Sequence, residues 1–282
     1  MLVGDTKITD TTGGEPTYRA KLTIPLEKTP FVIGAAGFTD LFSEFNRKIP
    51  IVVGERLREY QIKNIAQLVE TGMSHDEATA YVMSESIRLS QTQEPPAIED
   101  SKPVEKPKAA LPIPYVYTAE NFLDDCKGLI RGVVEQAETG YANPLEALAV
   151  IYRPQWKTAL LHYIDGRGRE STIDFYHPIG SGSPYVKMFF DRLYRWDRPL
   201  IELIGLACYA IAFTARVAKE AGVGYTITNP PQTLGVLPEG ACGEFRATNM
   251  PEVMADLEKQ LEGFTAQIAG FKPPVFDLVP SS

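Results

Sequence analysis

Apolar and polar positions follow two kinds of spacing in the first third of the chain. Residues 18–26 alternate between apolar and polar side chains, as in a half-buried strand, and residues 31–37 form an apolar run typical of a buried strand. Apolar side chains then recur at helical spacing over residues 38–48, 56–70 and 74–89. This part of the chain therefore predicts two strands followed by three helices.

The same two patterns return after residue 118. Helical spacing occurs in residues 119–138, 185–194, 199–221 and 251–269, and strand-like segments are residues 145–152, 158–164, 225–229 and 233–237. The short spacing predicts that 145–152 pairs with 158–164 and that 225–229 forms a hairpin with 233–237. Strands, helices, strands, helices and strands in this order indicate an α+β domain with two helical layers on a largely antiparallel core.

Residues 91–114 interrupt this periodicity. They contain six of the prolines, carry mixed charge and have few large apolar side chains, which is typical of a flexible insertion. An alternative is that this Pro-rich segment binds a partner as a polyproline ligand. Residues 271–282 are also Pro-rich and predict a flexible tail, so the expected organisation is one domain over residues 1–282.

The charge of the chain narrows the class of partner. The formal net charge is -8, and no dense Lys/Arg cluster occurs, which argues against nucleic acid as a partner. No membrane span and no secretory signal are expected from the apolar runs, so we expect a cytoplasmic protein. Cys126, Cys208 and Cys242 and the three histidines are widely scattered, so neither a metal site nor a cofactor is expected.

The most distinctive local feature is a loop of small residues, Gly180-Ser181-Gly182-Ser183-Pro184, between a strand-like segment and a helix. Glycine permits positive φ and close backbone approach, and a helix start presents backbone N–H groups. Two interpretations stay open from these residues. The loop holds an anion, an oxyanion or a reacting group, or it is a capped turn from strand to helix.

Four blocks in fixed order resemble a known family. These are residues 31–37 with the following helix, the turn at residues 165–168, the Gly-Ser-Gly-Ser loop, and the long helix with the strand pair ending at residue 238. Together they resemble a proteasome β-type subunit of the 20S core, in the N-terminal-nucleophile hydrolase family. The resemblance implies a four-layer αββα sandwich.

In that family an N-terminal threonine hydroxyl attacks the peptide carbonyl, and its own α-amine acts as the base. The resemblance implies that Lys21 matches the lysine that favours the deprotonated nucleophile, and that Asp5 orients this lysine. Ser181 matches a serine that hydrogen-bonds near the nucleophile, and Gly180, Gly182 and Ser183 form the binding loop around it. All are supporting roles.

Two departures from the family pattern bear on activity. The first strand with the threonine at its start is not found in the sequence, and the family's Asp and Ser after the long helix are not seen in residues 219–224. Thr11 is no substitute, because residues 13–20 are too few for a full strand, a turn and a second strand before Lys21.

Three functions follow as expectations. The first is a subunit of a self-compartmentalising, protein-degrading complex that is non-catalytic or N-terminally truncated, with itself or related subunits as ring partners. The second is an active threonine-type endopeptidase with a misplaced start site, acting on unfolded polypeptide, which the retained Asp5, Lys21 and Ser181 favour. The third is a non-enzymatic binding or scaffold module that docks through residues 91–114.

Overall fold

A computed structural model describes most of the chain. The described residues are 2–4, 7–8, 17–18, 21–25, 31–91, 117–137, 144–153, 158–218, 223–226, 231–236, 242–244 and 250–269. At the ends of some helices and in some short strands only the backbone is described.

A five-stranded antiparallel sheet forms the centre of the molecule, with the strand order β4-β5-β6-β7-β8. The strands are β4 (Leu22–Thr23), β5 (Phe31–Gly37), β6 (Leu145–Arg153), β7 (Thr158–Ile164) and β8 (Glu170–Ile173). The central strand β6 is apolar on both faces because both faces are covered by other layers, and most of its residues are buried. The predicted pairing of the segments now seen as β6 and β7 is confirmed.

A second sheet lies against one face of the first. It has the order β1-β9-β10, formed by β1 (Leu2–Gly4), β9 (Gln232–Val236) and β10 (Cys242–Glu244). The short strands β2 (Lys7–Ile8) and β3 (Thr17–Tyr18) pair separately. The predicted hairpin of 225–229 with 233–237 is wrong, because β9 pairs with β1 and β10 while residues 225–226 are not in a strand.

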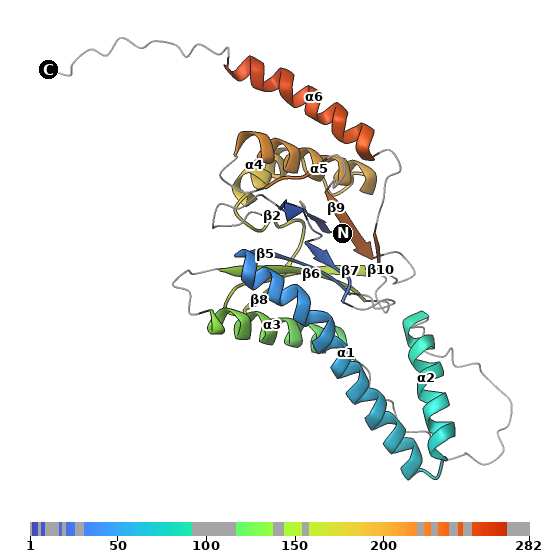
Figure 1. Cartoon of the computed structure of the whole chain (residues 1–282). Coiled ribbons are helices and arrows are strands. Elements are labelled where there is room, and N and C mark those ends of the chain that lie inside the picture. Colours follow the sequence, from blue (N-terminus) through green and yellow to red (C-terminus); the bar gives the residue numbers. More distant parts are fainter. Residues whose placement is uncertain are drawn as a thin grey trace.

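Helices cover the outer faces of the two sheets (Figure 1). The helices α1 (Thr39–Glu70) and α3 (Ala119–Gln136) pack on the five-stranded sheet. On the other side lie α4 (Ser183–Leu193), α5 (Leu200–Val217) and α6 (Met250–Ala269), where α5 contacts β1 and α6 packs on the outer side of α5. The fold is therefore the predicted α+β, four-layer αββα sandwich, with α6 added outside.

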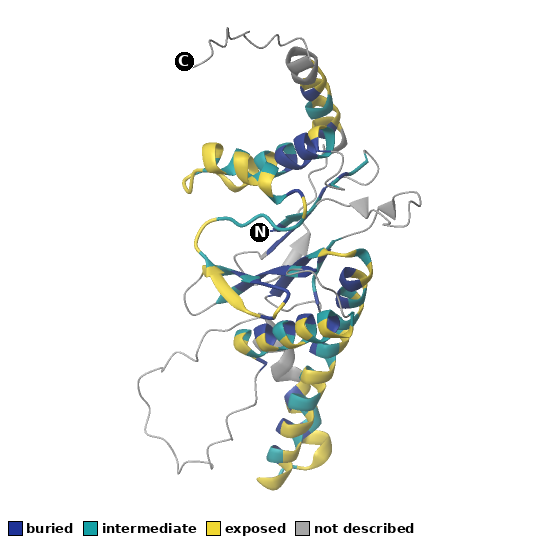
Figure 2. Ribbon diagram, turned by 90° about the vertical axis from the view of Figure 1, so that its left-hand side faces the viewer, coloured by how far each residue is buried: buried dark blue, intermediate teal, exposed yellow. Residues whose placement is uncertain are grey.

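Each interface between layers has its own apolar cluster. One lies between the five-stranded sheet and the pair α1–α3, and includes the fully buried Phe45, Phe122 and Ile130. A second lies between the two sheets and includes Val32 and Leu234. In Figure 2 the buried residues run through the sheets and the inward faces of the helices, while α4 and the projecting end of α1 are largely exposed.

Residues 38–48 and 56–70 belong to one helix of 32 residues, so the prediction of two helices is wrong. Pro50 falls between the two predicted helices, and it lies inside α1. A proline removes one backbone hydrogen bond, but the buried Ile49 and Val53 on either side hold the helix against the core. Tertiary packing thus outweighs the local preference of proline.

The far half of α1 projects beyond the sheets and carries α2 (His75–Gln91) beside it (Figure 1). A capping box begins α2: the Ser74 N–H donates to Glu77 Oε2 at 3.1 Å, and the Glu77 N–H donates to Ser74 Oγ at 3.3 Å. The predicted insertion 91–114 begins at the last residue of α2. Residues 92–114 and the predicted tail 271–282 lie outside the described part of the chain.

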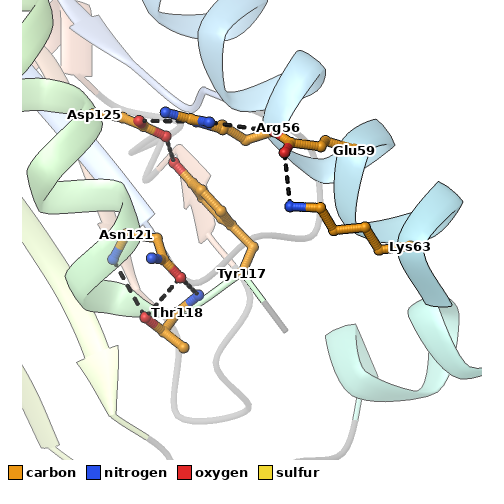
Figure 3. A network of polar contacts seen from close by, with 7 residues as sticks. All are labelled: Arg56, Glu59, Lys63, Tyr117, Thr118, Asn121 and Asp125. Atoms are coloured by element: carbon orange, nitrogen blue, oxygen red, sulfur yellow. Dashed lines mark hydrogen bonds and ion pairs between the residues drawn. The ribbon is translucent and has the colours of Figure 1, made fainter. Parts of the chain in front are cut away.

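A polar network fastens α1 to α3 (Figure 3). The Tyr117 hydroxyl donates to Asp125 Oδ2 at 2.9 Å, and Arg56 Nε donates to Asp125 Oδ1 at 3.3 Å. At the start of α3, Thr118 and Asn121 form a capping box. Asp125 of α3 therefore links Arg56 of α1 to Tyr117, which lies just before α3.

The sequence was expected to contain no segment apolar enough to span a membrane, and the helix α5 departs from that expectation. Among the described residues, Leu200–Val217 is long and apolar enough by length and composition alone. The core helix of a soluble protein passes the same test. In this helix 33% of the segment is buried, including Cys208, Ala212 and Phe213, which pack against neighbouring elements.

Candidate functional site

The Gly-Ser loop lies between β8 and α4 and rests on the end of β5. Gly180 has φ +84°, a left-handed conformation that favours glycine. A Cβ at this position would stand 3.1 Å from the Cβ of Ala36. Gly182 is buried, and a Cβ there would stand 2.6 Å from Val223 Cγ2. The sequence needs glycine at both positions because the loop is pressed between β5 and the segment that contains Val223.

Glu146, near the start of β6, ties this loop to the sheet. Its Oε1 accepts a hydrogen bond of 2.6 Å from the backbone N–H of Gly180, and its Oε2 accepts one of 3.0 Å from the Tyr163 hydroxyl. Glu146 pairs across the sheet with Ala36, the residue that Gly180 contacts. One half-buried carboxylate therefore joins β6, β7 and the loop.

Tyr163 and His177 complete the cluster. Their rings lie 4.5 Å apart, centroid to centroid, with the planes inclined by 46°. Burial, followed by the charge of Glu146, raises the pKa of Tyr163 to about 12. Burial lowers the pKa of His177 below its usual 6.5, although the negative charge of Glu146 opposes this change. At neutral pH both rings are therefore uncharged beside a carboxylate.

The hydrogen bonds of the loop decide between the two interpretations made from its sequence. The Gly180 N–H is occupied by Glu146, and the Ser183 N–H donates to the Gly180 carbonyl at 3.0 Å. The Tyr185 and Val186 N–H groups both donate to the carbonyl of Gly182. These backbone donors already have acceptors within the chain, so the arrangement favours a closed turn over an anion cradle at these positions.

The start of α4 differs in detail from the capped turn that was one of the two interpretations. Gly182 is the N-cap of α4, no side chain caps the helix, and Pro184 lies in its first turn. Proline suits this place because the N–H groups of the first turn have no partner within the helix. Glycine suits position 182 because there is no room for a Cβ, and backbone hydrogen bonds to its carbonyl take the place of a side-chain cap.

Lys21 and the loop flank the same end of β5. Lys21 is half-buried and directly precedes β4, whose Leu22 pairs with Gly34 of β5. Gly180 contacts Ala36, two residues further along the same strand. Ser181 is exposed, between the glycines that are fixed on either side of it. The fold thus brings the backbone of the predicted lysine and the predicted loop to the same end of β5.

Asp5, the third residue expected to support catalysis, lies outside the described part of the chain. The supporting roles predicted for Asp5, Lys21 and Ser181 stay predictions. So do the binding roles of Gly180, Gly182 and Ser183.

Glu146, Tyr163 and His177 were not singled out from the sequence as site residues. A signal for Glu146 was present, since it is the one acidic residue in a strand whose residues 147–151 are all apolar and buried. His177 begins the loop in the sequence, but its neighbour Tyr163 comes from another strand. Sequence spacing alone does not place these two rings side by side.

The turn predicted at residues 165–168 is held by its own acid. Asp165 Oδ1 accepts hydrogen bonds from the N–H groups of Arg167 and Arg169, each 2.9 Å long. Burial opposes ionisation of Asp165, but the bonds from Arg169 and Arg167 outweigh it and lower the pKa of this carboxyl. The residue therefore stabilises the turn between β7 and β8 and is committed to that role.

Metal-ligating and thiol chemistry find no support in the described residues. Among these residues no group of His, Cys, Asp and Glu could hold a metal ion. Cys126 and Cys208 are buried, and burial raises the pKa of both thiols. Raised thiol pKa values disfavour the reactive thiolate.

Comparison with known proteins adds structural neighbours only. No family model matches the sequence, and no curated protein matches it. The chain is similar to Anbu (ancestral beta-subunit) from Yersinia bercovieri, with 14% identity, a TM-score of 0.53, and coverage of 98% of this chain and 94% of that one.

Two further solved structures are similar to the chain. A Gly-1 mutant of Anbu from Hyphomicrobium sp. strain MC1 has 14% identity, a TM-score of 0.53, and coverage of 97% and 93% of the two chains. Anbu from the same strain has 17% identity, a TM-score of 0.52, and coverage of 98% and 94%. At these identities the likeness establishes the fold alone.

These neighbours correct the family expected from the sequence. The chain was expected to be a proteasome β-type subunit, and that assignment is wrong. The neighbours are Anbu proteins, which are proteasome-like but form a distinct family, and neither a family model nor a curated protein supports a proteasome β subunit. The general αββα arrangement is common to both, which explains why the ordered blocks pointed to the wrong one.

Proposed function

We propose that this chain is a subunit of a self-associating, proteasome-like assembly. The observation that carries the proposal is the match of the whole layered fold, over 98% of the chain, to a protein named as an ancestral beta-subunit. A shared fold supports a function by analogy, so the test is a direct measurement of assembly. The expected partners are further copies of this chain or related subunits, arranged in a ring.

In this proposal the Gly-Ser loop has a structural role. Its backbone donors at Gly180 and Ser183 are already used, and Glu146 locks it to the sheet. A loop closed in this way braces α4 against β5 and so supports the outer helical layer. That layer is one of the surfaces that neighbouring subunits can reach.

A light-scattering measurement of the full-length chain tests the proposal. We expect the molar mass of the folded chain to exceed the monomer mass of 31.2 kDa and to rise with concentration. A molar mass equal to that of the monomer over the whole accessible range would refute it.

The second candidate function is the threonine-type endopeptidase acting on unfolded polypeptide. Its support is the placement of Lys21 and the loop that carries Ser181 at one end of β5. A covalent threonine-directed inhibitor and fluorogenic peptides test it, with intact mass as the readout of an adduct. A stoichiometric adduct accompanied by peptide cleavage would establish the enzyme, whereas an unmodified mass would exclude it for this chain.

A further inference from the structure

The outward face of α1 carries a stripe of exposed apolar side chains. Ile51, Ile62 and Val69 are 49%, 61% and 39% exposed. At 3.6 residues per turn these three side chains lie on one side of the helix, opposite to the buried Ile49 and Val53. The stripe extends onto the part of α1 that projects beyond the sheets (Figure 1). Aligned apolar side chains on an exposed helix face are typical of a surface that packs against another helix.

Two charged side chains, Glu55 and Arg58, lie within this stripe. Both are exposed, and they stand between Ile51 and Ile62 at spacings of four, three and four residues, as in the seam of a coiled coil. Neither makes an ion pair or a hydrogen bond within the part of the chain that the structure describes, whereas the neighbouring charges of α1 are paired within the molecule. These two charges are therefore free to meet a partner.

The order of these four residues is self-complementary. Read in either direction, an apolar residue is followed after four, three and four residues by a charge, the opposite charge and a second apolar residue. When two copies of the helix pair antiparallel about a two-fold axis, Ile51 faces Ile62 of the second copy and Glu55 faces Arg58 of the second copy. A parallel pair would instead place like charges opposite each other, which is repulsive.

The charge of α1 as a whole also suits contact with a second copy. Residues 39–70 contain five acidic and five basic side chains, so the helix carries no net charge, whereas the chain carries -8. Two acidic molecules that approach through this helix avoid the repulsion that an acidic face would produce.

From these features we infer that the outward face of α1 binds the same face of a second copy of this chain, antiparallel and about a two-fold axis. The inference rests on the proposed assembly and names one surface that forms it. Each contact holds two Ile51–Ile62 pairs and two Glu55–Arg58 pairs. Exposed ion pairs add little affinity, so the apolar pairs carry the affinity and the charges set the direction and the register.

Charge reversals on the full chain test the inference. In Glu55→Arg both central positions are basic, and in Arg58→Glu both are acidic, so neither variant can pair with itself in the expected register. An equimolar mixture of the two variants restores opposite charges at every position. Glu135→Arg, at an exposed glutamate near the end of α3, is the matched control.

Sedimentation velocity over a concentration series measures association, and far-UV circular dichroism and the urea midpoint verify folding. We expect each single variant to associate at least about tenfold more weakly than the unsubstituted chain, the mixture to regain association, and Glu135→Arg to leave it unchanged. If one single variant fails to fold, the other is compared with the doubly reversed chain, which restores the opposite charges and should associate normally.

The contrary outcomes separate the inference from the proposed assembly. If the unsubstituted chain associates but both variants associate equally well, or their mixture associates no better than either alone, the inference is overturned and the proposed assembly stands. An equal loss in Glu135→Arg also overturns it, because the effect would then be one of total charge. If the unsubstituted chain is monomeric throughout, both fail.

Photocross-linking identifies what lies on the stripe. With benzoylphenylalanine in place of Ile51, we expect a link to residue 62. Positions 51 and 62 of one molecule lie about 16 Å apart along the helix, so this link comes from a second copy. A link to residues 92–114 of the same molecule would assign the stripe to that segment and overturn the inference.

Discussion

Replacing Glu146 by alanine tests the account of the Gly-Ser loop most sharply. The substitution removes both acceptors of the cluster and leaves the Gly180 N–H and the Tyr163 hydroxyl without the partners they have now. It creates little strain, because alanine is smaller and β6 already contains alanine at neighbouring positions. The loss of stability should therefore report the two hydrogen bonds.

The expected magnitude follows from the number and charge of those bonds. A hydrogen bond to a charged group contributes about 1.5–3 kcal/mol, so two of them set an upper value of about 3–6 kcal/mol. Glu146 is half-buried, so water replaces part of what is lost, and we expect Glu146→Ala to lower the free energy of unfolding by about 2–3 kcal/mol. Glu146→Gln keeps one acceptor and should lose about 1–2 kcal/mol.

Urea unfolding measures this loss, and amide hydrogen exchange locates it. The midpoint should fall without a change in the slope, and exchange should quicken in residues 178–183 more than in α3. Tyr163→Phe is the matched partner, since it removes one donor and should lose about 1 kcal/mol. In a Glu146→Ala background the same Tyr163 substitution should lose markedly less, because its acceptor is already gone.

Two outcomes would contradict this reasoning. One is a change of less than about 0.5 kcal/mol for Glu146→Ala, which is the range of an ordinary surface substitution. The other is full additivity of the Glu146 and Tyr163 substitutions, which would mean that the two side chains do not interact. Either result would remove the carboxylate as the link between the loop and the sheet.

Three further predictions concern other parts of the fold. Gly182→Ala should lower the free energy of unfolding by about 1–3 kcal/mol, because the new Cβ would stand 2.6 Å from Val223 Cγ2. Gly205→Ala should raise it by about 0.5–1 kcal/mol, because a Cβ there meets nothing within 4 Å. Thermal unfolding compares the two variants. Burial lowers the pKa of His177, so the unfolded chain takes up a proton first as the pH falls, and the free energy of unfolding should decrease below pH 6.5. Urea unfolding over a pH series should show a shallower decrease for His177→Gln. An equal decrease in both proteins would contradict this. Asp125→Ala should cost about 1–3 kcal/mol and loosen α1 from α3 in hydrogen exchange, while unchanged exchange there would argue against the bridge.

The layered fold was predictable because its signals are local and periodic. The strands at 31–37, 145–152 and 158–164 were predicted from their apolar content, and the helical spacing over residues 74–89 predicted the helix seen as α2. The single helix α1 was not predictable in this way, because what carries it through Pro50 is packing against residues far away in the sequence. The partners of β9 were missed for the same reason, since β1 is more than two hundred residues away.

The candidate site was predictable only in part. The loop itself was visible in the sequence because four small residues, 180–183, separate a strand-like segment from a helical one. The group that fixes it, Glu146, precedes Gly180 by 34 residues, and only the sheet register brings them together. The anion cradle was one of two interpretations left open, and it rested on the N–H groups at a helix start. The backbone hydrogen bonds of the folded loop use those at Gly180 and Ser183.

Native mass spectrometry of the intact, full-length chain tests the proposed assembly most directly, because it counts the copies in each particle. The account predicts particles at integer multiples of 31.2 kDa above one. A spectrum that holds only the 31.2 kDa monomer, under conditions in which the chain is folded, would contradict it.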